Sequence, residues 1–205
     1  MRVTTYKNDL PSDFHLPGDL AIDTETMGLN FNRDRLCVVQ ISNGDGDSYL
    51  IQFDGTNYEA PNLKKLLLDE NRGKIFHYAR FDLAVIKKYL DIELSNIFCT
   101  KVASKLVRTY TDYHGLKDLC RELLDITISK QQQSSYWGAS ELSDEQKEYA
   151  AKDVVYLHSL RAVLIERLIE SGRNKIAHKL FEFLPIRAEL DLLGWNDIDI
   201  FSHSS

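Results

Sequence analysis

The chain has 205 residues, 43% of them apolar, and a net charge of −6 at pH 7. This composition is typical of a globular protein, and it excludes a membrane-spanning protein because no stretch reaches the roughly 18 consecutive apolar residues that a span needs. The acidic charge also argues against a broad, nonspecific grip on duplex nucleic acid, which a basic surface usually provides.

We expect one domain over residues 1–205, located in the cytoplasm. The length suits a single large core, and no linker-like segment divides the sequence. The first ten residues, MRVTTYKNDL, lack the apolar segment of a signal peptide. The three cysteines, Cys37, Cys99 and Cys120, are odd in number and widely spaced, which favours reduced thiols over disulfides or a zinc site.

Five strands and two helices are expected in the first half of the chain. Apolar runs predict strands over residues 19–25, 35–43, 47–53, 74–78 and 96–100. The stretch NGDGD between the second and third strands predicts a hairpin turn, because a calcium loop would need a glutamate at its twelfth position. Helices are predicted over residues 61–70, which begin with a proline, and 80–90, where leucine and isoleucine recur on one face.

The second half of the chain is predicted to be helical. Apolar residues at helical spacing predict helices over residues 101–110, 115–124, 143–171 and 176–193. The polar stretch 128–142 predicts a loop. Strands with interleaved helices, followed by helices alone, predict an α/β fold with a mixed five-stranded sheet flanked by helices and a helical C-terminal half.

Two carboxylates, Asp23 and Glu25, follow the apolar start of the first predicted strand. Residues two apart in a strand point to the same face, so the two acids would stand together and repel each other. A divalent cation between them would offset this repulsion. Their place at the C-terminal end of a strand, where open α/β sheets put ligands, favours this interpretation, although solvated acids at a strand end would share the spacing.

Two further motifs carry carboxylates. Asp82 lies in the first turn of the predicted helix 80–90, where an aspartate is also a common helix cap. Tyr149 and Asp153 are four residues apart in a helix and therefore share a face. A surface ion pair would account for Asp153 alone, but it would not account for a tyrosine beside two alanines, which let a helix approach another surface closely.

Together these motifs resemble the DEDD superfamily of 3′-5′ exonucleases, in its tyrosine-containing subclass. The order D-x-E, then D, then Y-x-x-x-D is present here as Asp23 and Glu25, Asp82, and Tyr149 with Asp153. The chain resembles ribonuclease D in the residues before the last motif, which are Lys130, Gln133, Ser135, Trp137, Leu142 and Gln146. It departs from that family at Ser140 and Glu141, where ribonuclease D usually has Arg-Pro, and it ends before the accessory helical domains of that family.

The chain also resembles the stand-alone nanoRNase C family over nearly its whole length, through DRLCVVQIS, HYARFDLAV, KQQQSS and FLPIRAELDLLGW. These resemblances imply a ribonuclease H-like, DnaQ-like exonuclease fold and a phosphodiester hydrolase. They imply two divalent ions, Mg²⁺ or Mn²⁺, held by Asp23, Glu25, Asp82 and Asp153. Tyr149, with an ordinary pKa near 10, is a poor general base at neutral pH, so we expect its hydroxyl to orient the attacking water.

Substrate contacts are expected beside the acids. The resemblance implies contacts from Thr24, Met27, Gly28, Leu29, Gln40, His77 and Trp137. Leu29 and Met27 would wedge against the terminal bases, or would simply pack in the core. Gln40 and His77 could equally be satisfied buried residues, and Trp137 could stack a base or anchor the loop.

A group of basic residues, Lys101, Lys105 and Arg108, shares one helical face and could meet phosphates, although a solvated face is the more common reason for such a pattern.

We expect a metal-dependent 3′-5′ exoribonuclease that releases 5′-mononucleotides from short RNA, dinucleotides included, at the end of RNA decay. One alternative is trimming of structured RNA 3′ ends, as in ribonuclease D, and another is exonuclease action on DNA, since no residue obviously reads a 2′-hydroxyl. A catalytically dead nucleic-acid-binding module is disfavoured because all four acids and the tyrosine are present.

The end of the chain, KLFEFLPIRAELDLLGWNDIDIF, is apolar enough either to cover the core of its own domain or to pack against another subunit. The nanoRNase C resemblance implies a homo-oligomer, a ring of eight copies.

Overall fold

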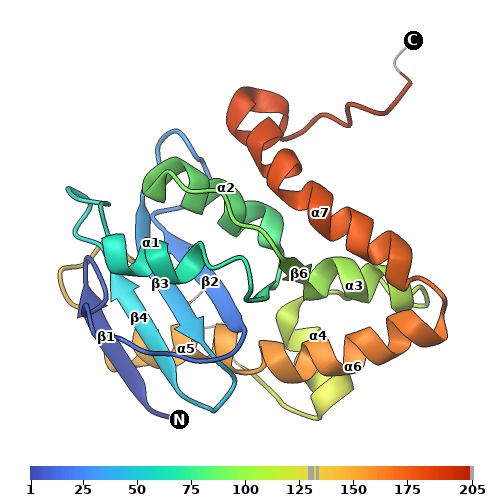
Figure 1. Cartoon of the computed structure of the whole chain (residues 1–205), viewed down its shortest axis with the longest axis horizontal. Helices are drawn as coiled ribbons and strands as arrows, with labels where there is room; N and C mark the ends of the chain where they lie inside the picture. Colours follow the sequence, from blue (N-terminus) through green and yellow to red (C-terminus); the bar gives the residue numbers. More distant parts are fainter. Residues whose placement is uncertain (129–131, 133, 204–205) are drawn as a thin grey trace.

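A mixed six-stranded sheet forms the centre of the first half of the chain in the computed structural model, which describes residues 1–128, 132 and 134–203 (Figure 1). The strands are β1 (Val3–Lys7), β2 (Leu20–Thr26), β3 (Leu36–Ser42), β4 (Ser48–Gln52), β5 (Lys74–Phe76) and β6 (Ile97–Cys99). Their order across the sheet is β1-β4-β3-β2-β5-β6. The pairs of β3 with its neighbours β2 and β4 are antiparallel, whereas the other three pairs are parallel.

The expected count of five strands was wrong, because β1 also joins the sheet. This strand has the sequence VTTYK, whose mixture of polar and apolar residues gives no continuous apolar run. It lies at the edge of the sheet, parallel to β4, and most of its residues are only half-buried. An edge strand needs little apolar surface, so composition alone did not reveal it.

Helices cover both faces of the sheet. Helix α5 (Asp144–Val155) packs on β2, β3 and β4, while α1 (Pro61–Leu67) and α2 (Ala79–Leu90) lie on the opposite face (Figure 1). Every residue of β3 is buried as a consequence, which explains why its sequence, LCVVQIS, is nearly continuous in apolar residues. The central position of β2 between β3 and β5 places its acidic residues in the middle of the sheet.

The remaining helices build the second half: α3 (Thr100–Val107), α4 (Leu116–Leu124), α6 (Leu157–Glu170), α7 (Asn174–Leu190) and the short π-helical turn η1 (Asp191–Trp195). The single helix predicted over residues 143–171 is divided at Tyr156 into α5 and α6. Helix α5 lies on the sheet, whereas α6 packs on α3, α4 and α7. No glycine or proline marks this break, so the requirement to pack against two different surfaces decides it.

The predicted α/β architecture with a helical second half is otherwise confirmed. Among the described residues, no helix combines the length and the apolar character that crossing a membrane requires.

Candidate active site

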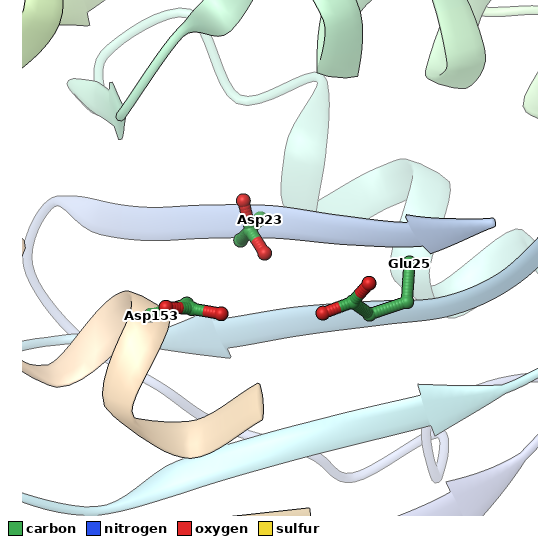
Figure 2. Close-up of side chains that lie close together, drawn as sticks. All are labelled: Asp23, Glu25 and Asp153. Atoms are coloured by element: carbon green, nitrogen blue, oxygen red, sulfur yellow. The ribbon is translucent and has the colours of Figure 1, made fainter. Parts of the chain in front are cut away.

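Three carboxylates meet above the middle of the sheet. Asp23 and Glu25 project from the same face of β2, and Asp153 projects toward them from α5 (Figure 2). One carboxylate oxygen from each residue lies within 4.8 Å of the other two. This convergence follows from two periodicities, since alternate residues of a strand and residues of one helical face point in a common direction.

The N-terminus of α5 is fixed by a reciprocal cap. The Ser143 hydroxyl accepts a hydrogen bond from the backbone N–H of Gln146, and the Gln146 side chain accepts one from the backbone N–H of Ser143. Ala150 and Ala151 are fully buried and bring the helix close to the sheet. The same helix therefore presents Asp153 to the acids of β2.

Asp82 approaches the site from the other face of β2. It lies in the first turn of α2, is 3% exposed, and its Oδ1 accepts a 2.7 Å hydrogen bond from the Thr24 hydroxyl. Thr24 lies between Asp23 and Glu25 in β2, so its side chain points away from theirs. The carboxylate of Asp82 is accordingly outside the three-acid group, although repulsion from Asp23 still raises the pKa of Asp82.

Burial disfavours the ionised form of all four acids. Burial raises the pKa of Asp23 to about 7, and it raises the pKa of Glu25, Asp82 and Asp153 well above the usual range. Repulsion from neighbouring carboxylates raises the pKa of the last three further. No ion pair between described residues involves any of the four.

Tyr149 stands beside the acids on α5. Burial, with the negative charge of Asp153 next, raises the pKa of the Tyr149 hydroxyl far above its ordinary value, so the hydroxyl stays protonated. Its ring packs against Trp137, with 6.1 Å between the ring centroids. Trp137 is only 2% exposed, which supports the expectation that it anchors the loop before α5 and leaves little of its ring free to stack a base.

A cleft of about 700 Å³ opens at the acids. Of the expected substrate contacts, the lining includes Thr24, Met27, Gly28, Leu29, His77 and Trp137. Leu29 is 80% exposed and Met27 is 39% exposed, so neither serves as core packing. His77 is half-buried and its Nδ1 lies 2.9 Å from the Thr100 hydroxyl.

Gln40 lies outside the lining of the cleft. It is fully buried on β3, directly opposite Asp23 in the strand register, and its Nε2 lies 3.4 Å from Asp23 Oδ2. This geometry holds the Asp23 carboxylate in place and does not bring Gln40 to the cleft surface.

The basic residues expected on one helical face have different surroundings. Lys101 lines the cleft, and its Nζ lies 4.3 Å from the centre of the Tyr78 ring. Arg108 is fully buried and paired with Glu122, so it is neither a phosphate contact nor part of a solvated face. The interpretation of Arg108 from its spacing alone was therefore wrong, while Lys105 is exposed and lies outside the lining of the cleft.

The cleft is also lined by Tyr78, Phe81 and Lys117, which no motif in the sequence predicted as contacts. Tyr78 precedes α2 in a left-handed conformation (φ 70°), which a bulky residue rarely adopts, and it is 44% exposed. Backbone conformation of this kind leaves no trace in composition. Lys130 and Gln133, which carry part of the ribonuclease D resemblance, lie outside the described residues, whereas Ser135 lines the cleft.

The chain is similar in sequence and structure to known proteins. The model of a 3′-5′ exonuclease family matches residues 7–169. The structure of Brucella melitensis NrnC bound to pGG is 56% identical, with a TM-score of 0.96 and 100% of each chain covered. A structure of the same protein with bound Mg²⁺ is also 56% identical over 100% of both chains, with a TM-score of 0.94.

Two curated relatives match over part of their length. DNA polymerase I of Aquifex aeolicus is 38% identical over 180 residues, which is 85% of this chain and 29% of the relative. Ribonuclease D of Gluconacetobacter diazotrophicus is 32% identical over 154 residues, which is 75% of this chain and 39% of the relative. This chain thus spans well under half the length of either curated protein.

Proposed function

Since this chain belongs to the 3′-5′ exonuclease family and is a 3′-5′ exonuclease related to NrnC and ribonuclease D, we propose that it releases 5′-mononucleotides from short RNA, dinucleotides included. The observation that carries the proposal is the group of half-buried acids, Asp23, Glu25 and Asp153, that lines the cleft with Tyr149 beside it. The whole chain contributes one exonuclease domain in this proposal.

The acids fit a pair of divalent ions, and we assign Asp23, Glu25, Asp82 and Asp153 to hold them. Carboxylate oxygens are the ligands that Mg²⁺ and Mn²⁺ prefer, and four negative charges would balance two such ions. Burial raises the pKa of these carboxylates, and no ion pair among the described residues involves them, which is the observation in this chain that calls for cations. When bound, the ions supply an activated hydroxide and stabilise the departing 3′-oxygen.

The protein's own groups orient the reaction. The neutral Tyr149 hydroxyl can donate a hydrogen bond but cannot take up a proton, which suits a role in holding the attacking water in line with the phosphorus atom. Gln40 and Thr24 hold the carboxylates of Asp23 and Asp82, so the geometry of the acids is set before substrate binds.

The cleft supports a short substrate. Leu29 and Met27 present exposed apolar side chains at its edge, where they could wedge against a terminal base. Lys101 and Lys117 supply the positive charge that a phosphate would meet on the wall. The relative bound to pGG and the ribonuclease D relatives favour RNA, whereas the DNA polymerase I relative keeps DNA as the second candidate.

We further propose that the enzyme acts as a cytoplasmic homo-oligomer, the eight-membered ring that the nanoRNase C resemblance implies. The support is the number of exposed apolar side chains on α7 and the segment after it, which are Ile176, Leu180, Ile186, Leu193, Trp195, Ile198, Ile200 and Phe201. A monomer in light scattering would contradict this part of the proposal.

The proposed substrate is tested with a time course on a 5′-labelled RNA dinucleotide, on the corresponding DNA dinucleotide and on an RNA of about 20 nucleotides, with Mn²⁺ and with EDTA. We expect Mn²⁺-dependent release of mononucleotide that is much faster from the dinucleotide. Comparable or faster trimming of the long RNA would favour a ribonuclease D-like role. Cleavage of DNA dinucleotide alone would move the substrate class to DNA.

A further inference from the structure

A partly buried ion pair joins the C-terminal part of the chain to the helix that carries Asp82. Arg80, in the first turn of α2, donates from Nε to Oδ2 of Asp191 at 2.5 Å and from Nη2 to Oδ1 at 2.6 Å. Asp191 begins η1, and its side chain is 2% exposed. Arg187 of α7 lies 3.2 Å from the same carboxylate, so two guanidinium groups share one buried acid.

The backbone of the C-terminal turn completes this connection. The Arg80 guanidinium donates a 2.6 Å hydrogen bond to the carbonyl oxygen of Asn196, and the Arg187 guanidinium donates one to the carbonyl oxygen of Trp195 at 2.9 Å. Arg80 thereby holds the turn against the start of α2, while Arg187 holds it against the end of α7. A bidentate pair fixes orientation as well as distance, which a single lysine contact would not do.

The same turn borders the loop that carries Leu29. A second cavity, of about 430 Å³, is lined on one side by residues 29–33 and on the other by Asp191, Leu192, Gly194 and Asn196. Asp34 closes this loop by accepting a 2.9 Å hydrogen bond from the backbone N–H of Asn30. Gly28 is required here, since a Cβ at this position would lie 2.4 Å from Asp34 Oδ2.

We propose that Asp191 is a positioning residue for the exonuclease cleft, acting through Arg80 on the outer wall formed by Tyr78 and Leu29. Tyr78 is two residues before Arg80 and holds a left-handed conformation, which persists in a bulky residue only when the surroundings impose it. The Arg80–Asp191 pair supplies that constraint at the point where α2 begins. Asp191 touches neither the acids nor the cleft, so its effect falls on substrate placement.

This inference rests on the proposed function, and its test separates the two. The variant Asp191→Asn keeps the shape of the side chain but leaves two guanidinium groups facing a neutral amide. The matched control is Glu189→Gln, which removes another ion pair between α2 and α7, the one with Lys87 at 3.0 Å, at the opposite end of α2. Both variants are compared with the wild-type chain on the RNA dinucleotide at saturating Mn²⁺.

We expect Asp191→Asn to raise KM at least about tenfold while kcat stays within about twofold and half-saturating Mn²⁺ is unchanged, because the wall moves and the metal acids do not. Glu189→Gln should leave KM at the wild-type value. An unchanged KM in Asp191→Asn, or an equal rise in Glu189→Gln, would overturn the proposal. If Asp191→Asn does not fold, Arg80→Lys, which keeps the charge but loses the bidentate fork, must show the same rise in KM.

A second readout does not depend on activity. The chain has two tryptophans, so Trp195 of η1 is the only fluorescent indole in a Trp137→Phe background. Asp191→Asn should shift the Trp195 emission of the folded protein, whereas Glu189→Gln should not. If the wild-type enzyme cleaves no dinucleotide, the proposed function fails, and an unchanged Trp195 emission would then overturn the positioning role separately.

Discussion

Two groups of charged side chains are wholly or partly buried in this protein, and they differ in how their charges are balanced. In the cleft, Asp23, Glu25 and Asp153 converge, and no positively charged side chain in the described part of the chain forms an ion pair with them. Between α3 and α4, Arg108 is fully buried but donates a 3.1 Å hydrogen bond from Nε to Glu122, and others to the Ser104 hydroxyl at 3.0 Å and the Tyr113 carbonyl at 2.7 Å.

The two groups also differ in how folding changes the pKa of their carboxylates. Pairing with Arg108 lowers the pKa of Glu122 to about 2, so this pair favours the folded, ionised state. Burial and repulsion raise the pKa of the cleft acids, so folding these residues close together costs free energy. A protein tolerates such a cost where a ligand offsets it. We therefore interpret the cleft acids, whose charges are not balanced, as the functional group, and the balanced pair of Arg108 and Glu122 as part of the scaffold.

The largest effect is expected from Asp153→Asn, which reduces the charge imbalance. The exonuclease rate at saturating substrate should fall at least about 10³-fold, because holding a metal ion in place is worth several kcal/mol to the transition state. The metal-free protein should nevertheless melt at a higher temperature than the wild type, since a repelling carboxylate is gone. A lower melting temperature would show that Asp153 serves folding, which would remove the distinction between the two groups.

Breaking the pair of Arg108 and Glu122 should have the opposite effect: stability should fall and activity should be kept. Glu122→Gln leaves the buried Arg108 charge without its counterion and should lower the free energy of unfolding by about 2 kcal/mol, a modest value because Glu122 itself is partly exposed. The value of kcat on the dinucleotide should change less than about twofold. Chemical denaturation gives the first quantity and steady-state kinetics the second.

Tyr149→Phe sharpens the comparison inside the cleft, because it removes a neutral group and leaves the charges untouched. We expect kcat to fall about tenfold, the equivalent of one lost hydrogen bond of about 1.4 kcal/mol to the attacking water. The Mn²⁺ affinity should match that of the wild type. Loss of Mn²⁺ binding in this variant would count against an orienting role and would place the hydroxyl among the metal contacts.

The pH dependence of stability should differ in sign between the two groups. The pKa of Asp23 is raised to about 7 from 3.8, so without metal the free energy of unfolding should decrease as pH rises from about 4 to 7. The pKa of Glu122 is lowered to about 2 from 4.5, so its contribution is present above about 4.5 and is lost as pH falls through 2. Denaturation of metal-free protein between pH 4 and 8 measures the first slope, and Asp23→Asn should flatten it.

Local motifs could be predicted from the sequence, whereas relations between distant segments could not. The two-residue spacing of Asp23 and Glu25 and the four-residue spacing of Tyr149 and Asp153 each fix a common direction within one element, so the sequence alone placed them on shared faces. The pair Arg80 and Asp191 is separated by 111 residues, and no periodicity connects them. The helical spacing of Arg108 is visible in the sequence and led to its assignment to a surface. Its ion-pair partner Glu122 lies on the next helix, and no sequence pattern links the two.

Elements decided by tertiary packing were missed for the same reason. The edge strand β1 has too few apolar residues to signal a strand, yet its backbone pairs with β4. The break at Tyr156 occurs in a sequence with uninterrupted helical character, because α5 must follow the sheet and α6 the neighbouring helices.

Calorimetric titration of the wild-type chain and of Asp153→Asn with Mn²⁺ alone tests the central claim most directly, because it asks whether cations balance the acids of the cleft. We predict about two Mn²⁺ ions per wild-type chain and loss of at least one of them in Asp153→Asn. Glu122→Gln should bind Mn²⁺ like the wild type. Absence of Mn²⁺ binding to the wild type, or equal binding to Asp153→Asn, would contradict the assignment of this acidic group as the metal centre of the exonuclease.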